Sequence, residues 1–259
     1  MNTPRRSPAP PLRSSAEQRR GDPGKRSGTM APAELRDPHV LTLEDGAVLL
    51  EGHPFRSVVV MGDSVAAGLR EPAHGYLDLS MADRLHDALA AGPPDLSFTN
   101  LGVTGLKIAE VTATQLDAAL ERRPDLVVLS AGGNDAFERG FDRDRTASEL
   151  AHLAGRLSEA GARVVLIGLF DIGGSGLLPE EIGRKMTAKF GVLDEVMHQV
   201  AQQVLGCVVS DNRQHPLSQD PSIFSSDLIH CNARGHAVAA ATLLRDVHRL
   251  AVEESGRAA

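Results

Sequence analysis

Short apolar runs alternate with longer segments of helical period from residue 40 onward. The short runs are rich in β-branched residues and are followed by Gly, Asp or Asn, as buried parallel strands often are. They predict five strands, at residues 56–61, 96–100, 125–130, 163–169 and 207–210. Amphipathic segments lie between and after them, at residues 76–89, 108–122, 146–160, 184–204 and 232–253. These segments have lengths that suit helices connecting parallel strands, so the pattern predicts an α/β fold.

The secondary structure of the segment before the first predicted strand is less clearly indicated by the sequence. Residues 41–50 contain an Asp-Gly pair between alternating positions, which predicts a hairpin or a lead-in loop. No internal repeat and no Pro/Gly/Ser-rich linker interrupts the sequence after Pro38. We therefore expect one folded domain over residues 39–259.

Residues 1–38 differ from the rest in composition. They are rich in proline and hold eight of the 27 Lys/Arg but four of the 34 Asp/Glu, which leaves 19 against 30 elsewhere. Such a basic segment predicts a disordered tail, and Met30 within it offers a second start of translation. The acidic remainder disfavours nucleic acid as a partner.

Cysteine content and hydropathy indicate the cellular compartment in which the protein is expected. Cys207 and Cys231 are the two cysteines, and neither has a second cysteine at zinc-ligand spacing, which predicts free thiols in a reducing compartment. No apolar run reaches eighteen residues, and the first forty residues lack the apolar stretch of a secretory signal. We therefore expect a cytoplasmic protein without stable membrane association. The sequence leaves the oligomeric state open.

The loops after the predicted strands carry reactive groups, and the carboxyl ends of parallel strands meet at one edge of the sheet. Ser64 follows the first strand closely, behind a glycine that permits a tight turn. A serine nucleophile needs a base within hydrogen-bond reach, and His230 is the candidate. Asp227, three residues earlier, can orient its imidazole. The three residues predict a catalytic triad for acyl transfer.

Three donors are candidates for stabilising the oxyanion of such a reaction: the backbone N–H groups of Ser64 and Gly102 and the side-chain amide of Asn134. Each motif alone has an ordinary structural explanation. Gly-Asp-Ser and Gly-Gly-Asn-Asp are frequent in turns, and Asp-x-x-His is often a cap or a surface pair. Their position in successive strand-end loops favours one converging site.

These four segments together resemble the blocks of the SGNH hydrolases, the GDSL-like lipase/esterase family. VVVMGDS ends at Ser64, NLGVTG contains Gly102, SAGGNDAF contains Asn134, and DLIHCNARGH contains Asp227 and His230. The resemblance covers roughly residues 56–250. It implies a flavodoxin-like three-layer α/β/α sandwich with a five-stranded parallel sheet, an acyl-serine mechanism, and no metal or organic cofactor. Stretches such as GYLDLSMADRL and ARVVLIGLFDI resemble intracellular actinobacterial members.

Some residues depart from the family pattern or lie beside its motifs. Val65 stands where leucine is common, which leaves the chemistry intact, and Cys231 stands where proline is common. We expect no catalytic role for Cys231. Asp63 and Asp135 flank the loops and are expected to hold turns. Residues 171–179, after the fourth strand, predict a mobile loop that lines or covers the acyl site.

Eight further histidines are expected to be structural. His236 resembles a family position that supports the fold. Seven others show no carboxylate partner at metal-ligand spacing and are expected at the surface or in packing: His53, His74, His86, His152, His198, His215 and His248.

The motifs favour a serine esterase that hydrolyses a small soluble carboxylic ester or thioester through an acyl-Ser64 intermediate. The absence of Trp and the single Tyr76 disfavour a polysaccharide deacetylase, and the lack of a basic amphipathic segment disfavours an interfacial lipase. An acyltransferase with the same triad and a catalytically inactive binding protein remain alternatives. A nucleotide-binding module is disfavoured because the glycines match no phosphate-binding loop.

Overall fold

The computed structural model describes residues 32–258. Its centre is a five-stranded parallel sheet in the order β2-β1-β3-β4-β5. The strands are β1 (Ser57–Gly62), β2 (Ser97–Asn100), β3 (Leu126–Ser130), β4 (Arg163–Ile167) and β5 (Cys207–Ser210). Every residue of β3 and β4 is buried, because helices cover both faces of the sheet. The five predicted strands and the parallel sheet are confirmed.

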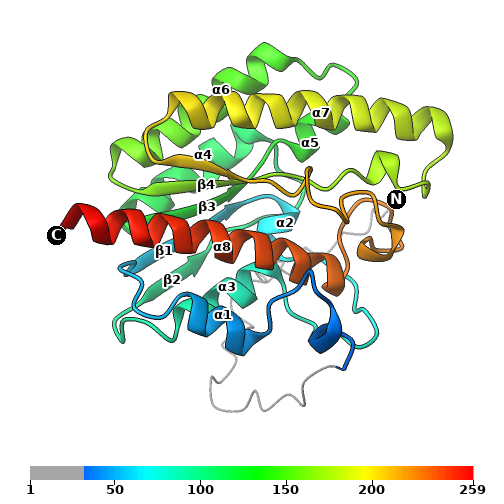
Figure 1. Cartoon of the computed structure of the whole chain (residues 1–259). Helices are drawn as coiled ribbons and strands as arrows, with labels where there is room; N and C mark the ends of the chain where they lie inside the picture. The colour runs from blue at the N-terminus through cyan, green and yellow to red at the C-terminus, as the bar shows by residue number, and fades with distance from the viewer. Residues whose placement is uncertain (1–31, 259) are drawn as a thin grey trace, which may run out of the picture.

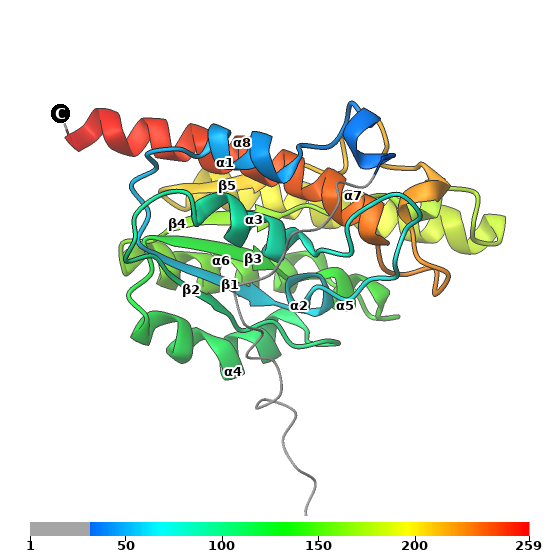
Figure 2. The same ribbon diagram turned by 90° about the horizontal axis from the view of Figure 1, so that it is seen from below.

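The long helices form two layers, one on each side of the sheet (Figure 1). One layer contains α4 (Ile108–Glu121), α6 (Arg143–Glu159) and α7 (Glu180–Gln203). The other contains α1 (Leu43–Leu49), α3 (Met81–Leu89) and α8 (Ala233–Ala258), which pack against one another. Figure 2, seen from below, shows α1 and α3 beside the long α8 on one side of the strands, with α4 and α6 on the other. The result is the three-layer α/β/α sandwich with flavodoxin-like strand order.

Short helical elements lie at the ends of the strands and in the loops. They are η2 (Glu34–Arg36), α2 (Ser64–Ala67), α5 (Gly133–Phe137), η3 (Ile172–Gly174) and η4 (Pro221–Ile223). Because α2 and α5 begin directly after β1 and β3, they lie at the carboxyl edge of the sheet. Within residues 32–258, no helix is both long and apolar enough to cross a membrane.

The hairpin or loop expected over residues 41–50 is wrong, because this segment forms α1. Thr42 accepts a hydrogen bond from the Asp45 N–H at 3.0 Å, and the Asp45 carboxylate accepts one from the Thr42 N–H at 3.3 Å. This capping box begins a helix just before the Asp-Gly pair. A Cβ on Gly46 would lie 3.1 Å from Leu244 Cδ1. The glycine therefore allows α8 to approach α1 closely, instead of making a turn.

The expected disorder of residues 1–38 is wrong for residues 32–38, and residues 1–31 lie outside the described residues. Glu34 is buried and forms a two-bond ion pair with Arg84 of α3, at 2.7 Å and 3.1 Å. Asp37 accepts hydrogen bonds from the Tyr76 hydroxyl at 2.7 Å and from Arg234 Nε at 2.9 Å. Buried charges paired in this way attach the segment to α3 and α8.

We predict that Glu34→Gln destabilises the fold. Glu34 and Arg84 have side chains 5% and 2% exposed, so the substitution leaves a buried guanidinium without its counter-charge. The expected loss is about 3–5 kcal/mol in the free energy of unfolding, measured by urea denaturation. Asp95→Asn is the control: it breaks a pair with Arg56 in which both side chains are more than 60% exposed, and it should cost less than about 1 kcal/mol. Equal losses in the two variants would contradict the buried pair's importance.

Candidate active site

The turn from β1 into α2 places Ser64. Gly62 has a φ of +128°, and a Cβ at this position would lie 1.8 Å from the Ser130 carbonyl oxygen. A side chain is therefore excluded by space and by backbone conformation. Asp63 caps α2 by accepting the Val65 N–H at 3.0 Å. Ser64 is the first residue of the helix, so its backbone N–H is one of the free first-turn donors.

Asp63 holds this turn with a buried carboxyl side chain. It is 3% exposed, and its Oδ1 also accepts a hydrogen bond from Ser130 Oγ at 3.1 Å. Burial raises the pKa of Asp63 to about 6, against the opposing hydrogen bonds from Val65 and Ser130. Its contacts agree with the expected structural role. Asp135 likewise accepts the N–H of Ile108 at 3.1 Å and connects α5 to the start of α4.

His230 lies between Ser64 and Asp227. Its Nε2 is 2.8 Å from Ser64 Oγ, and its Nδ1 is 2.7 Å from Asp227 Oδ2. The other carboxylate oxygen, Asp227 Oδ1, accepts the N–H groups of Ile229 and His230, each at 3.0 Å. Burial acts to raise the pKa of Asp227, but these hydrogen bonds outweigh it and hold the pKa below its usual value. A carboxylate on Nδ1 leaves Nε2 free to accept the serine proton.

The turn that carries the base has an unusual backbone. Leu228 has a φ of +58°, which is costly for a residue with a branched side chain. The Ser225 N–H donates to the His230 carbonyl at 2.8 Å, and Phe224 and Cys231 form an antiparallel bridge below the turn. These contacts hold the left-handed residue between the aspartate and the histidine, so that both side chains can meet.

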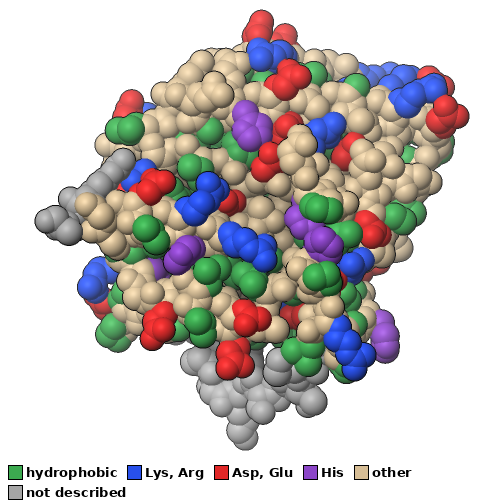
Figure 3. Space-filling view, in the orientation of Figure 1, with side chains coloured by type: hydrophobic (Ala, Val, Ile, Leu, Met, Phe, Trp, Pro, Cys, Tyr) green, Lys and Arg blue, Asp and Glu red, His purple; other side chains and the backbone are tan. Residues whose placement is uncertain are grey.

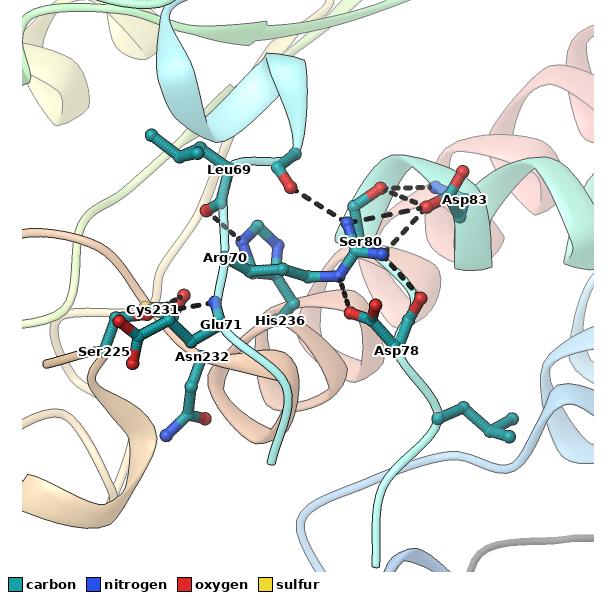
Figure 4. Close-up of polar contacts among 12 residues, drawn as sticks. Leu69, Arg70, Glu71, Asp78, Ser80, Asp83, Ser225, Cys231, Asn232 and His236 are labelled. Atoms are coloured by element: carbon teal, nitrogen blue, oxygen red, sulfur yellow. Dashed lines mark hydrogen bonds and ion pairs between the residues drawn. The ribbon is translucent and has the colours of Figure 1, made fainter. Parts of the chain in front are cut away.

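The segment after α2 connects the nucleophile to this turn (Figure 4). His236 of α8 accepts the Met81 N–H at Nδ1, at 3.1 Å, and its Nε2 donates to the Leu69 carbonyl at 3.2 Å. Burial lowers the pKa of His236 to about 4, so the ring stays neutral. The Glu71 N–H donates to Ser225 Oγ at 3.3 Å. His236 therefore supports the site, as expected from the sequence.

Cys231 lies directly behind the base and lines the same pocket. Burial raises the pKa of its thiol to about 12, so the sulfur stays protonated. A protonated thiol is a poor nucleophile, which agrees with the expectation that Cys231 has no catalytic role.

Of the expected oxyanion donors, Asn134 is placed at the site. It lines the pocket beside Ser64, and its Nδ2 donates one hydrogen to the Leu106 carbonyl at 2.9 Å. An amide nitrogen carries two hydrogens, so the second can donate to a substrate. The bond to Leu106 orients the amide and also brings the loop after β2 beside α5.

Gly102 is not placed as expected. Its N–H already donates to Asn100 Oδ1 at 2.9 Å. A Cβ on Gly102 would lie 2.4 Å from the Ala67 nitrogen, so glycine is needed for close packing on α2. Gly105, which sequence reasoning missed, precedes Leu106 and has a φ of +82° with open space around it. Among the described residues, no group accepts a hydrogen bond from its N–H.

An apolar pocket extends from Ser64 toward the ends of β4 and β5. Its apolar lining includes Leu69, Ile167, Leu169, Phe170, Phe190, Phe224 and Ala239. Three of the lining residues, Leu69, Phe137 and Ile229, are each more than 40% exposed, which places them at the mouth of the pocket. The pocket can hold an apolar group attached to a carbonyl at Ser64.

Residues 171–179, expected to form a mobile loop that lines or covers the acyl site, do not line the pocket. Asp171 is buried and accepts hydrogen bonds from Thr187 Oγ1 and Gln219 Nε2, each at 2.9 Å. A Cβ on Gly173 would lie 2.5 Å from the Gly183 carbonyl oxygen, so this loop packs tightly against α7. The segment is therefore attached at its beginning and lies beside the pocket instead of covering it.

The strand order and the hydrogen-bonded Ser64, His230 and Asp227 define the class: an α/β protein with a serine-hydrolase type of triad. The chain belongs to the GDSL-like Lipase/Acylhydrolase family, whose model matches residues 60–238. All the candidate triad residues lie within that range.

Two curated proteins are similar in sequence. An arylesterase of Vibrio mimicus is 29% identical over 110 residues, which is 42% of this chain and 52% of the arylesterase. Esterase TesA of Pseudomonas aeruginosa is 30% identical over 115 residues, which is 44% of this chain and 54% of TesA. The chain therefore spans about half the length of these relatives.

Solved structures share the fold. LAE5, an alpha/beta hydrolase enzyme from the metagenome of Lake Arreo, has a TM-score of 0.60 at 22% identity and covers 77% of this chain and 97% of its own. Axe2, an acetylxylan esterase from Geobacillus stearothermophilus, has a TM-score of 0.56 at 19% identity, covering 76% and 95%. A structure of TesA has a TM-score of 0.58 at 24% identity, covering 75% and 99%.

We predict that Asp63→Asn changes how stability depends on pH. The pKa of Asp63 rises from 3.8 to about 6 on folding, so between these pH values the folded state holds a proton that the unfolded state has lost. Stability should therefore fall as pH rises through this window, by up to about 3 kcal/mol. The asparagine has no proton to lose, and the variant should lack this fall.

Urea denaturation between pH 4 and 7 measures the effect. The matched control is Asp117→Asn, which changes an exposed aspartate on α4 and should keep the wild-type profile. If the free energy of unfolding falls with pH equally in Asp63→Asn and in the wild type, Asp63 is not the group responsible for the fall.

Proposed function

We propose that the protein is a serine esterase that hydrolyses a small soluble carboxylic ester or thioester through an acyl-Ser64 intermediate. The observation that carries the proposal is the geometry of His230, 2.8 Å from Ser64 Oγ and 2.7 Å from Asp227, beside an apolar pocket. Membership in the GDSL-like Lipase/Acylhydrolase family supports it. So does the similarity to an arylesterase and to esterase TesA.

In the proposed reaction, His230 Nε2 accepts the proton as Ser64 Oγ attacks the carbonyl carbon. Asp227 keeps the imidazole oriented and stabilises its positive charge. The histidine then donates the proton to the leaving alcohol or thiol, and the acyl group stays on Ser64. A water molecule, deprotonated by the same nitrogen, releases the acid and restores the serine. The apolar pocket holds the acyl chain during both steps.

The oxyanion is assigned to the Ser64 N–H, the second amide hydrogen of Asn134 and the Gly105 N–H. Gly105 replaces Gly102 in this assignment because the Gly102 N–H is already bonded to Asn100. Gly105 also adjoins Leu106, whose carbonyl accepts a hydrogen bond from Asn134. Three donors around one oxygen would stabilise the charge that develops in the transition state.

The location and partners stay predictions. We expect a cytoplasmic protein, similar to intracellular actinobacterial members of the family, whose partner is a small-molecule ester or thioester. Acidic and basic side chains are interspersed over the face shown in Figure 3, which supports the expectation that nucleic acid is not a partner.

We predict that a fluorophosphonate forms one covalent adduct on the wild-type protein and none on Ser64→Ala, because an activated serine attacks phosphorus as it attacks a carbonyl. Intact-protein mass spectrometry detects the adduct without any choice of substrate. Ser64→Ala should also lower kcat by about 10⁶ on any ester found to turn over. Ser97→Ala, in β2, is the control and should react as wild type does. Folded wild-type protein that stays unlabelled would overturn the proposed function.

We predict that Asn134→Ala lowers kcat by about 10²–10³ with little change in KM, because its amide acts on charge that exists only in the transition state. Steady-state kinetics on an active ester measure the split. A change confined to KM would mark Asn134 as a ground-state binding residue.

A structure of the phosphonylated protein tests the assignment of Gly105 as the third oxyanion donor. The phosphonyl oxygen should lie within hydrogen-bond distance of the Gly105 nitrogen. A contact with the Gly102 nitrogen instead would support Gly102 as the donor, as the sequence predicted.

A further inference from the structure

Three side chains of the types that ligate metals converge away from the proposed active site. Asp194 and His198 lie one turn apart on α7, and Asp211 follows β5 directly. One ligand atom from each lies within 4.8 Å of the others. Figure 1 shows α7 running along the edge of the sheet where β5 lies. The expectation that His198 has no carboxylate partner at ligand spacing is therefore wrong: Asp194 precedes it by four residues, and the fold adds Asp211.

The separations suit a shared ion better than direct hydrogen bonds. His198 Nε2 lies 3.3 Å from Asp211 Oδ2 and 3.9 Å from Asp194 Oδ1. Zinc binds such atoms at about 2.0–2.2 Å, which separates tetrahedral ligands by roughly 3.4 Å. None of the hydrogen bonds among the described residues joins His198 to either carboxylate. His198 therefore contacts the two carboxylates only at ion-pair separations, without a hydrogen bond to either.

The second observation is an unsatisfied buried oxygen. Asp194 Oδ1 is buried and, among the described residues, accepts no hydrogen bond. Burial raises the pKa of Asp194, and the negative charge of Asp211 raises it further. An oxygen in this state lacks a positive partner at short range, which a metal ion supplies.

The surrounding charges leave a negative excess. Besides His198 itself, Arg213 is a cation that faces Asp194, but its Nη1 is 3.8 Å from Asp171 and its Nη2 donates to the Thr187 carbonyl. Its charge is therefore shared with Asp171. Glu195 adds further negative charge near Asp194. A divalent cation would offset this excess.

We propose that Asp194, His198 and Asp211 bind a divalent transition-metal ion of the zinc type, with water completing its coordination. One imidazole nitrogen and two carboxylate oxygens favour zinc, cobalt or manganese over magnesium and calcium, which prefer oxygen ligands alone. His198 is 44% exposed, so an ion can enter from solvent. The bound ion would join α7 to the segment after β5. Phe190 of α7 and Asn212, next to Asp211, both line the substrate pocket, so the ion would stabilise one wall of it.

The test uses the full-length protein after removal of metal with EDTA. Wild type should bind one equivalent of Co²⁺, with a visible absorption band typical of low coordination number, and Zn²⁺ should displace it. Zn²⁺ should also raise Tm in proportion to the logarithm of its free concentration above Kd, whereas Mg²⁺ at the same concentration should not.

His198→Gln and Asp211→Asn should each weaken the binding of Co²⁺ and Zn²⁺ by more than about 100-fold. The asparagine keeps the oxygen that accepts the Gln214 N–H at 3.0 Å, so this variant is expected to fold, which circular dichroism checks.

Two controls separate this site from other histidines. His86 is 48% exposed and its Nδ1 lies 3.7 Å from one aspartate, so His86→Gln removes a similar histidine that lacks the third ligand. His230→Gln removes the proposed catalytic imidazole. Both variants should bind one equivalent as wild type does. The proposal is overturned if wild type binds no stoichiometric ion, if His198→Gln and Asp211→Asn bind normally, if His230→Gln loses the ion, or if Mg²⁺ raises Tm as zinc does.

Discussion

The candidate active site depends on how closely β1 approaches β3 where β1 ends. Gly62 stands so near Ser130 that any side chain would overlap its carbonyl oxygen. Gln115 of α4 fixes the same peptide from the other side: its Oε1 accepts the Gly62 N–H at 2.7 Å, and its Nε2 donates to the Gly62 carbonyl at 2.8 Å. Because residue 62 is held by two elements, α2 starts at one defined place, and Ser64 with it. A nucleophile must be positioned this precisely to meet its base.

Burial shifts the pKa of three titratable groups around the nucleophile toward their neutral forms. Burial raises the pKa of the Cys231 thiol and lowers that of His236, so both favour their uncharged forms near neutral pH, and it raises the pKa of Asp63 to about 6, so that this carboxyl holds its proton below that pH. Asp227 is the exception. It is 43% exposed and accepts two backbone N–H groups, which keep it ionised beside His230. The negative charge at the site is thereby concentrated on the side of the imidazole that faces away from Ser64, where it can stabilise an imidazolium ion.

Much of the fold and site could be predicted because both rest on local patterns. The β-branched runs predict the strands, and Ser64 and Asn134 follow β1 and β3 closely. Other features could not be predicted. An Asp-Gly pair suits a hairpin as well as a helix: the capping box of Thr42 and Asp45 is a local signal for the helix at residues 41–50, but the close packing of Gly46 against Leu244 is not. The choice between Gly102 and Gly105 depends on the path of a loop, since Asn100 binds the N–H of one and leaves the other free.

The sequence by itself determined the order of the strands along the chain, the loops that carry reactive groups, and the pairing of Asp227 with His230, which are three residues apart in one turn. Only the tertiary structure decided that Ser64 and His230 meet, that Glu34 pairs with Arg84, and that Asp211 joins Asp194 and His198. Each of these contacts joins segments far apart along the chain. Their separation is set by how helices pack on the sheet and how loops return across it, and a local pattern of residues does not contain that information.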